Sequence, residues 1–247
     1  AQREATPEDI KWAVPVIKDI IRAYNIPILE VPGYEADDVI GTLAMKGREA
    51  GLEVHMVTPD KDYAQLVKPG IFMRRPGHGA SAMEKLGPDE VCQKYGISHT
   101  DQVIDLLGLM GDTADNVPGC PGVGEKTAVK LITQFGSIDN LLNSTDQLKG
   151  AIKRKVEENK EQISFSKFLV TIKTDVPIDL NLDTLRTTEP NKEALRPIYE
   201  NLEFRAFLKK FDDKPAEVQK SVSELGALFD AQPDNRQPGN RVQPNGG

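Results

Sequence analysis

Seven acidic side chains in three short clusters are the residues of this 247-residue sequence best suited to chemistry. The clusters are Glu35, Asp37 and Asp38, then Asp60 and Asp62, then Asp112 and Asp115. Without cations, two such charges roughly 4 Å apart repel by about 4 kcal/mol at an effective dielectric near 20. Hard oxygen ligands suit Mg²⁺ or Mn²⁺. Two such ions about 3.5–4 Å apart would stabilise the attacking and leaving oxygens of a phosphodiester cleavage.

The pattern of apolar residues places the first two clusters at the edge of an α/β sheet. Short apolar runs at 27–31, 54–57 and 71–73 predict buried strands, and helical periodicity predicts helices over 6–24 and after residue 35. This alternation is typical of a parallel sheet. The helix near residue 6 should have Thr6 as its cap and Pro7 at its first position. Ligands bind beyond the carboxyl ends of parallel strands, so the clusters at 35–38 and 60–62 should converge.

From residue 88 onward the pattern is helical almost throughout. Helices are expected over 88–95, 101–110, 125–134, 137–143, 147–158 and 191–201. Asp112 and Asp115 follow the apolar helix 101–110, and their spacing allows both to lie on one helical face. A simpler reading of all three clusters stays open, since acids near helix N-termini also stabilise the helix dipole.

Residues 117–128 have the pattern of a helix–hairpin–helix. Gly122 and Gly124 flank Val123, and these glycines allow a tight turn and a close approach to phosphate. The next helix would present free N–H groups to that phosphate, with Lys126, Thr127 and Lys130 in its first turns. Such a device contacts the DNA backbone and carries no sequence information.

Composition excludes several classes of protein. The apolar fraction is 38% and the charged fraction 28%, which indicates a soluble globular chain in the cytoplasm, with no membrane span. The net charge of −7 is unusual for a DNA-binding protein, but bound divalent ions would offset the acidic clusters. Cys92 and Cys120 have no zinc-ligand spacing and are expected to be reduced and buried. No nucleophile–histidine arrangement or phosphate-binding glycine loop occurs.

Four segments together resemble the 5′-nuclease domain of bacterial DNA polymerase I, a relative of the flap endonucleases. They are GYEADD (33–38), TPDKD (58–62), GDTADNVPG (111–119) and GVGEKTA (122–128). The resemblance covers roughly residues 1–211. It implies an α/β nuclease core of the flap-endonuclease type over 1–110, a helical helix–hairpin–helix subdomain over 111–211, and a flexible linker over 212–247. It also implies an N-terminal truncation, because the family's first strand and much of its helical arch have no counterpart here.

The resemblance also implies roles for particular residues. Glu35 and Asp37 would bind a first metal with Asp38 beside them, and the other four acids, Asp60, Asp62, Asp112 and Asp115, would bind a second. Carbonyl groups around Gly122, Val123 and Gly124 would hold K⁺ against a DNA phosphate. Arg3 matches the end of a Tyr-Lys-x-x-Arg segment at the base of the arch.

The sequence therefore predicts a structure-specific 5′-3′ exonuclease or flap endonuclease that uses two metal ions. Its partners would be DNA with 5′ ends, flaps or nicks, and polymerase domains in the same full-length chain. Because of the missing segment, the chain alone is expected to be weakly active or inactive. The alternative is a non-catalytic DNA-binding module that uses the hairpin alone. An RNA-cutting nuclease is less favoured, because such small domains generally lack the hairpin.

Overall fold

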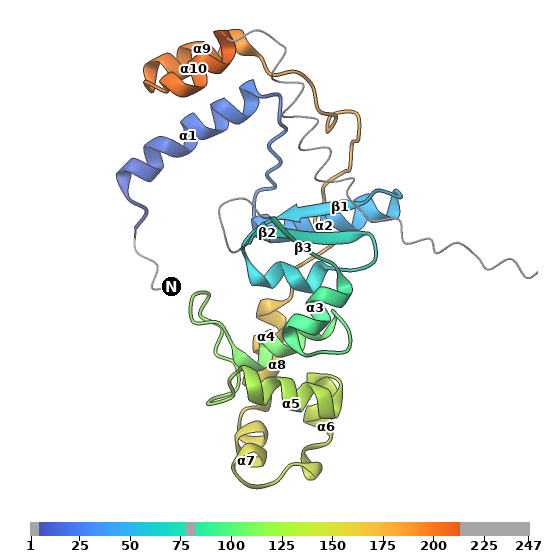
Figure 1. Ribbon diagram of the computed structural model, residues 1–247. Helices are drawn as coiled ribbons and strands as arrows, with labels where there is room; N and C mark the ends of the chain where they lie inside the picture. The colour runs from blue at the N-terminus through green and yellow to red at the C-terminus, as the bar shows by residue number, and fades with distance from the viewer. Residues whose placement is uncertain (1–4, 78–82, 213–247) are drawn as a thin grey trace, which may run out of the picture. The chain divides into compact units, whose positions relative to one another are not determined.

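The chain forms two compact units. The computed structural model describes residues 5–77 and 83–212 (Figure 1). The first unit contains residues 27–186, and the second combines residues 6–26 with residues from 187 onward. Arg3 and nearly all of the expected linker 212–247 lie outside the described residues, and the expected boundary at residue 110 stays a prediction.

Within the described residues, the sheet of the first unit has three strands in the order β1-β2-β3. Strands β1 (Val54–Val57) and β2 (Ile71–Pro76) are parallel, with Val54 opposite Ile71. The parallel pairing of β1 and β2 confirms the expected parallel sheet, and β3 (Met83–Leu86) adds a strand that runs antiparallel to β2. Alternate β2 residues, Ile71 and Met73, are buried in the core, as the two-residue period of a strand requires.

The expected strand at 27–31 is wrong for this structure. Those residues have no regular structure, and Leu29 is 41% exposed. A strand needs a neighbour to satisfy its backbone groups, and no described strand pairs with this segment. The helix after the turn is confirmed as α2 (Ala36–Glu49), which contacts β1 and β2.

Helices continue the first unit beyond the sheet (Figure 1). They are α3 (Pro88–Tyr95), α4 (Gln102–Met110), α5 (Glu125–Phe135), α6 (Ile138–Asn143), α7 (Gly150–Glu158) and α8 (Lys160–Val170). Helix α4 is the centre of this part, with Val103, Leu106 and Leu109 almost fully buried and with α5 and α8 packed against it. Apart from Gln102 and Asp105, its residues are apolar or glycine, because neighbours surround the helix. The sequence reading missed α8.

The second unit contains α1 (Glu8–Ala23), α9 (Lys192–Asn201) and α10 (Arg205–Asp212). Its small core contains Ala23, Leu195 and Tyr199, and the hydroxyl groups of Tyr199 and Tyr24 are 3.0 Å apart. Helix α1 starts one residue later than expected: Pro7 is the residue before the helix, and no side chain caps it.

The apolar stripe of α1 is exposed rather than buried. Ile10 and Ile17 are each 51% exposed, and Val14 is 42% exposed. Within residues 5–77 and 83–212, no helix is long and apolar enough to cross a membrane.

Candidate metal and DNA site

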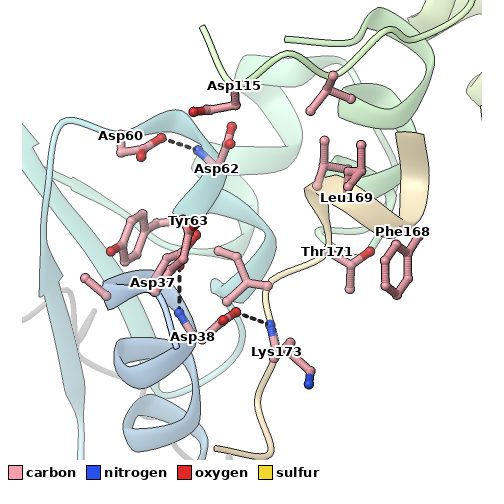
Figure 2. A pocket seen from close by; sticks show the side chains of 15 residues that line it. Asp37, Asp38, Asp60, Asp62, Tyr63, Asp115, Phe168, Leu169, Thr171 and Lys173 are labelled. Carbon is pink, nitrogen blue, oxygen red and sulfur yellow. Dashed lines mark hydrogen bonds between the residues drawn. The ribbon is translucent and has the colours of Figure 1, made fainter. Parts of the chain in front are cut away.

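Two of the three acidic clusters and Asp115 of the third line a single pocket of about 680 Å³ in the first unit (Figure 2). The acids that line it are Glu35, Asp37, Asp38, Asp60, Asp62 and Asp115. Tyr63 and residues 168–173, at and after the end of α8, complete the wall. The expected convergence of the first two clusters therefore holds, although residues 27–34, which precede the first cluster, form no strand.

The first cluster lies at the start of α2. Glu35 is the residue before the helix, and its carboxylate makes no capping hydrogen bond. The Asp37 carboxylate accepts a hydrogen bond from the Asp38 N–H at 2.9 Å, and the Asp38 carboxylate accepts one from the Lys173 N–H at 2.8 Å. Asp38 thus ties the segment after α8 to the start of α2. Burial, with repulsion from Asp38 and Asp60, raises the pKa of Asp37.

The second cluster follows β1, where a 3₁₀ helix spans Lys61–Leu66. Asp60 caps this helix by accepting a hydrogen bond from the Asp62 N–H at 3.0 Å. Burial, then repulsion from Asp60, Asp112 and Asp115, raises the pKa of Asp62 to about 6. The Oδ1 atom of Asp62 is buried and has no hydrogen-bond partner in the described structure. A buried carboxylate oxygen without a partner is costly unless a proton or cation reaches it.

The third cluster lies in a turn rather than on a helical face, which corrects the sequence expectation. Asp112 and Val117 close the turn with reciprocal backbone hydrogen bonds of 2.9 and 2.7 Å. One oxygen each from Asp62, Asp112 and Asp115 lies within 4.8 Å of the other two. Asp60 lines the same pocket but is not a member of this three-carboxylate group.

Lys61 neutralises part of the third cluster, a role that its residue type alone does not assign to it. Its ammonium lies 2.7 Å from Oδ2 of Asp112. This contact lowers the pKa of Asp112 and raises that of Lys61. The one sequence feature that could have indicated this role is the position of the lysine between two acids, Asp60 and Asp62. Tyr63 is also in the pocket wall, and burial beside Asp37 and Asp60 raises its pKa to about 12, so its hydroxyl stays protonated.

The hairpin is fixed to α4 by two glycines that approach each other closely. Gly111 and Gly119 both have positive φ, of 71° and 64°. A Cβ atom on Gly119 would lie 2.5 Å from the backbone nitrogen of Gly111, so a larger residue would separate the two segments. The Cys120 N–H donates to the carbonyl of Leu109 at 2.8 Å. The hairpin therefore has a fixed position relative to the turn that carries Asp112 and Asp115.

The expected hairpin residues lie at the start of α5. Val123 is buried, while Gly122, Gly124, Lys126 and Lys130 are exposed and Thr127 is half-buried. Gly124 precedes the helix, and its carbonyl accepts hydrogen bonds from the Thr127 and Ala128 N–H groups. The carbonyls of Gly122 and Val123 accept none from the described residues, so these two oxygens could act as ligands for a cation.

Lys155 of α7 reaches the hairpin, which sequence reasoning did not anticipate. Its ammonium lies so close to Gly122 that a Cβ atom on that residue would clash with it. Within the described structure, no carboxylate pairs with this ammonium, whereas its neighbour Lys153 pairs with Glu157. Residue type and spacing in α7 do not indicate this neighbour, which follows only from the packing of the helix.

Family models and related sequences both match this chain to 5′-3′ exonuclease domains and to DNA polymerase I. Residues 1–96 match the family model "5′-3′ exonuclease, N-terminal resolvase-like domain", and residues 98–193 match "5′-3′ exonuclease, C-terminal SAM fold". Relatives include DNA polymerase I of Bacillus caldotenax, 38% identical over 90% of this chain, and that of Bacillus subtilis, 40% identical over 90%. The chain spans about a quarter, 25%, of the length of each.

Solved structures with the same fold include nucleases. A bacteriophage T5 flap endonuclease in complex with DNA and metal ions matches 78% of this chain and 66% of its own, with a TM-score of 0.57 at 18% identity. A T5 5′-exonuclease with bound zinc matches 80% and 71%, with a TM-score of 0.58 at 17% identity. The catalytic core of Rad2 with DNA matches 80% and 66%, with a TM-score of 0.56 at 15% identity.

Proposed function

Because the chain belongs to the 5′-3′ exonuclease family, we propose that it hydrolyses phosphodiesters at 5′ ends, flaps and nicks of DNA. The observation that supports this most strongly is the buried, unpartnered Oδ1 of Asp62 beside Asp112 and Asp115. Three carboxylates this close need positive charge between them. Their oxygen chemistry suits Mg²⁺ or Mn²⁺.

The pocket offers ligands for two divalent ions. Asp62, Asp112 and Asp115 would hold one, with Asp60 nearby, and Glu35 and Asp37 would hold the other from the start of α2. When bound, such ions supply Lewis acidity and a water of lowered pKa. Asp38 takes a positioning role, because its carboxylate already holds the Lys173 N–H.

The hairpin would hold the DNA while the acids act. Lys126 and Lys130 are exposed on α5 and can contact phosphates, and the carbonyls of Gly122 and Val123 can bind K⁺ next to a phosphate. Arg3 would add a contact to the scissile phosphate. These contacts go to the backbone, so the specificity would be for DNA structure rather than sequence. In full-length relatives the product would pass to polymerase domains of the same protein, and the reaction would take place in the cytoplasm.

A second candidate function is DNA binding without cutting. The ion pair between Lys61 and Asp112 favours it, because that pair neutralises part of the acidic cluster without a metal. The two functions differ in their need for Mg²⁺. Hydrolysis requires the ion, whereas backbone binding through the hairpin does not.

The test is a cleavage assay on a 5′-flap DNA that carries a fluorophore on the flap, with Mg²⁺ or with a chelator. Asp115→Asn is the test variant, and Asp139→Asn, on α6 outside the pocket, is the matched control. We expect weak, Mg²⁺-dependent release of the flap by the wild-type chain and by Asp139→Asn, and loss of release in Asp115→Asn. Binding of the flap DNA without any release in Mg²⁺ would support the non-catalytic alternative instead.

A further inference from the structure

Helix α8 carries an exposed aromatic pair at the rim of the acidic pocket. Phe168 is 73% exposed and Phe165 is 55% exposed. Their rings stack with centroids 6.4 Å apart and planes inclined by 21°. Phe168 and Leu169 are part of the pocket wall, and Figure 2 shows Phe168 on the α8 side, across the pocket from Asp37 and Asp60. Neither ring belongs to the hydrophobic core formed by the described residues of the first unit.

The aromatic pair is fixed relative to both parts of the proposed DNA site. Ser166, which lies between the two rings in sequence, accepts a hydrogen bond from the Gly119 N–H of the hairpin at 3.0 Å. Gln162 donates to the Gly119 carbonyl at 2.8 Å. At its other end, α8 leads to the Lys173 N–H that donates to Asp38. DNA that contacts the hairpin and places a phosphate among the acids must therefore pass close to α8.

A phenylalanine ring in this place suits an unpaired nucleobase. It has no hydrogen-bonding groups, so it offers only an apolar face, on which any of the four bases can stack. Bases inside a duplex are covered by their neighbours, but those of a flap or a frayed 5′ end have free faces. We infer that Phe168, supported by Phe165, stacks on an unpaired base of the strand whose phosphate enters the acidic pocket. This inference rests on the proposed nuclease function and makes Phe168 a specificity-determining residue.

Two 5′-flap DNAs that differ only at the flap provide the test, one with normal bases and one with abasic sites in the unpaired nucleotides next to the junction. Binding is measured by fluorescence anisotropy in Ca²⁺, and cleavage in Mg²⁺. The wild-type chain should bind the normal flap roughly five-fold or more tightly than the abasic one, the scale of one base–aromatic stack. Phe168→Ala and Phe168→Leu should lose this preference, and Phe168→Trp should keep it. Phe207→Ala, which removes an exposed ring from the second unit, is the matched control.

The outcomes separate this inference from the proposed function. If the wild-type chain cuts the flap but Phe168→Ala keeps the preference for normal bases, Phe168 does not stack on DNA while the nuclease function stands. The same conclusion follows if the wild-type chain cuts both flaps and binds them equally. If the wild-type chain neither binds nor cuts either DNA, the proposed function itself is wrong. A stacking role also predicts that Phe168→Ala leaves the salt dependence of binding unchanged, because no phosphate contact is lost.

Discussion

At the scale of single residues, the charges of Asp62 and Lys61 are compensated to different degrees. Asp62 is half-buried among like charges, and its buried Oδ1 atom has no hydrogen-bond partner in the described structure. Lys61, next to it in the chain, directs its charge to Asp112 rather than to Asp62. Among the described residues, Lys61 compensates only part of the pocket's negative charge, so the pocket should respond to protons and to cations.

The stability of the metal-free protein should depend on the protonation of Asp62. Its folded-state pKa, about 6, lies above the ordinary value of 3.8. The folded state thus binds the proton more tightly than the unfolded state does, which favours folding at low pH. This contribution is lost as pH rises through about 6. Urea unfolding in a chelator should show a decrease in stability between pH 5 and pH 7.5 that is smaller in Asp62→Asn. Equal pH dependence in the two proteins would contradict this assignment.

Replacing Lys61 with methionine should have opposite effects on the metal-free and metal-bound protein. The ammonium is half exposed, so its loss should cost the metal-free protein no more than about 1 kcal/mol. Asp112 would then be free to bind a cation without first giving up Lys61, so Mn²⁺ should bind several-fold more tightly. Calorimetric titration of Mn²⁺ into Lys61→Met and the wild type measures this. Weaker Mn²⁺ binding in the variant would show that Lys61 supports the site.

At the scale of elements, the hairpin depends on its contacts with α7 and α8 as well as on its own turn. Ser166 and Gln162 of α8 bind both backbone groups of Gly119. Lys155 of α7 lies against Gly122. The hairpin, although one continuous segment of the sequence, is therefore held in place by residues up to 47 positions away.

Gly122→Ala should destabilise the protein more than Gly51→Ala does. Both glycines have positive φ, 69° and 80°, so alanine costs on the order of 1 kcal/mol at either position. No atom lies within 4 Å of a Cβ at Gly51, whereas one at Gly122 would meet the ammonium of Lys155. Urea unfolding measures the free energy of unfolding that each variant loses. The additional loss in Gly122→Ala, relative to Gly51→Ala, should decrease when Lys155→Ala is combined with Gly122→Ala. Strictly additive effects would mean that the two residues do not interact.

Lys126 is expected to contact a DNA phosphate. Lys126→Ala should weaken binding to all duplex sequences about equally, and the slope of log affinity against log salt should decrease by about 0.9, the share of one phosphate. Lys11→Ala is the control, since Lys11 pairs with Glu8 in the second unit. An unchanged slope, or a loss restricted to certain sequences, would assign Lys126 another role.

At the scale of the whole molecule, the two units have separate cores. The core of the second unit is small. It consists mainly of Leu195, which is fully buried, and of the aromatic rings packed around Tyr199. The acidic pocket and hairpin lie entirely in the first unit. Damage to the second core should therefore leave the site intact.

Leu195→Ala tests this separation. Removing a buried leucine side chain should cost about 2–5 kcal/mol. Hydrogen exchange measured by mass spectrometry should increase in α1, α9 and α10 and stay unchanged in α4 and α8. Mn²⁺ affinity should be the same as in the wild type. Faster exchange throughout α4 would show that the two units unfold together.

The sequence alone determined which residues could act and much of the local structure. The acidic clusters, the hairpin and six helices after residue 88 follow from residue types and short spacings, because helix periodicity, turns and capping depend on neighbours in the chain. The same spacings also carried the family resemblance, which the comparisons confirm.

Which of these residues come into contact depends on the tertiary structure. It placed Asp62, Asp112 and Asp115 together, paired Lys61 with Asp112, and brought Lys155 to Gly122. It also made β3 antiparallel and left 27–31 without a strand, since strand pairing depends on partners far away in the sequence. The exposure of Phe168 at the pocket rim is a result of the same kind. A phenylalanine in a helix is usually a core residue, and only the packing of α8 on α4 shows that this one faces outward.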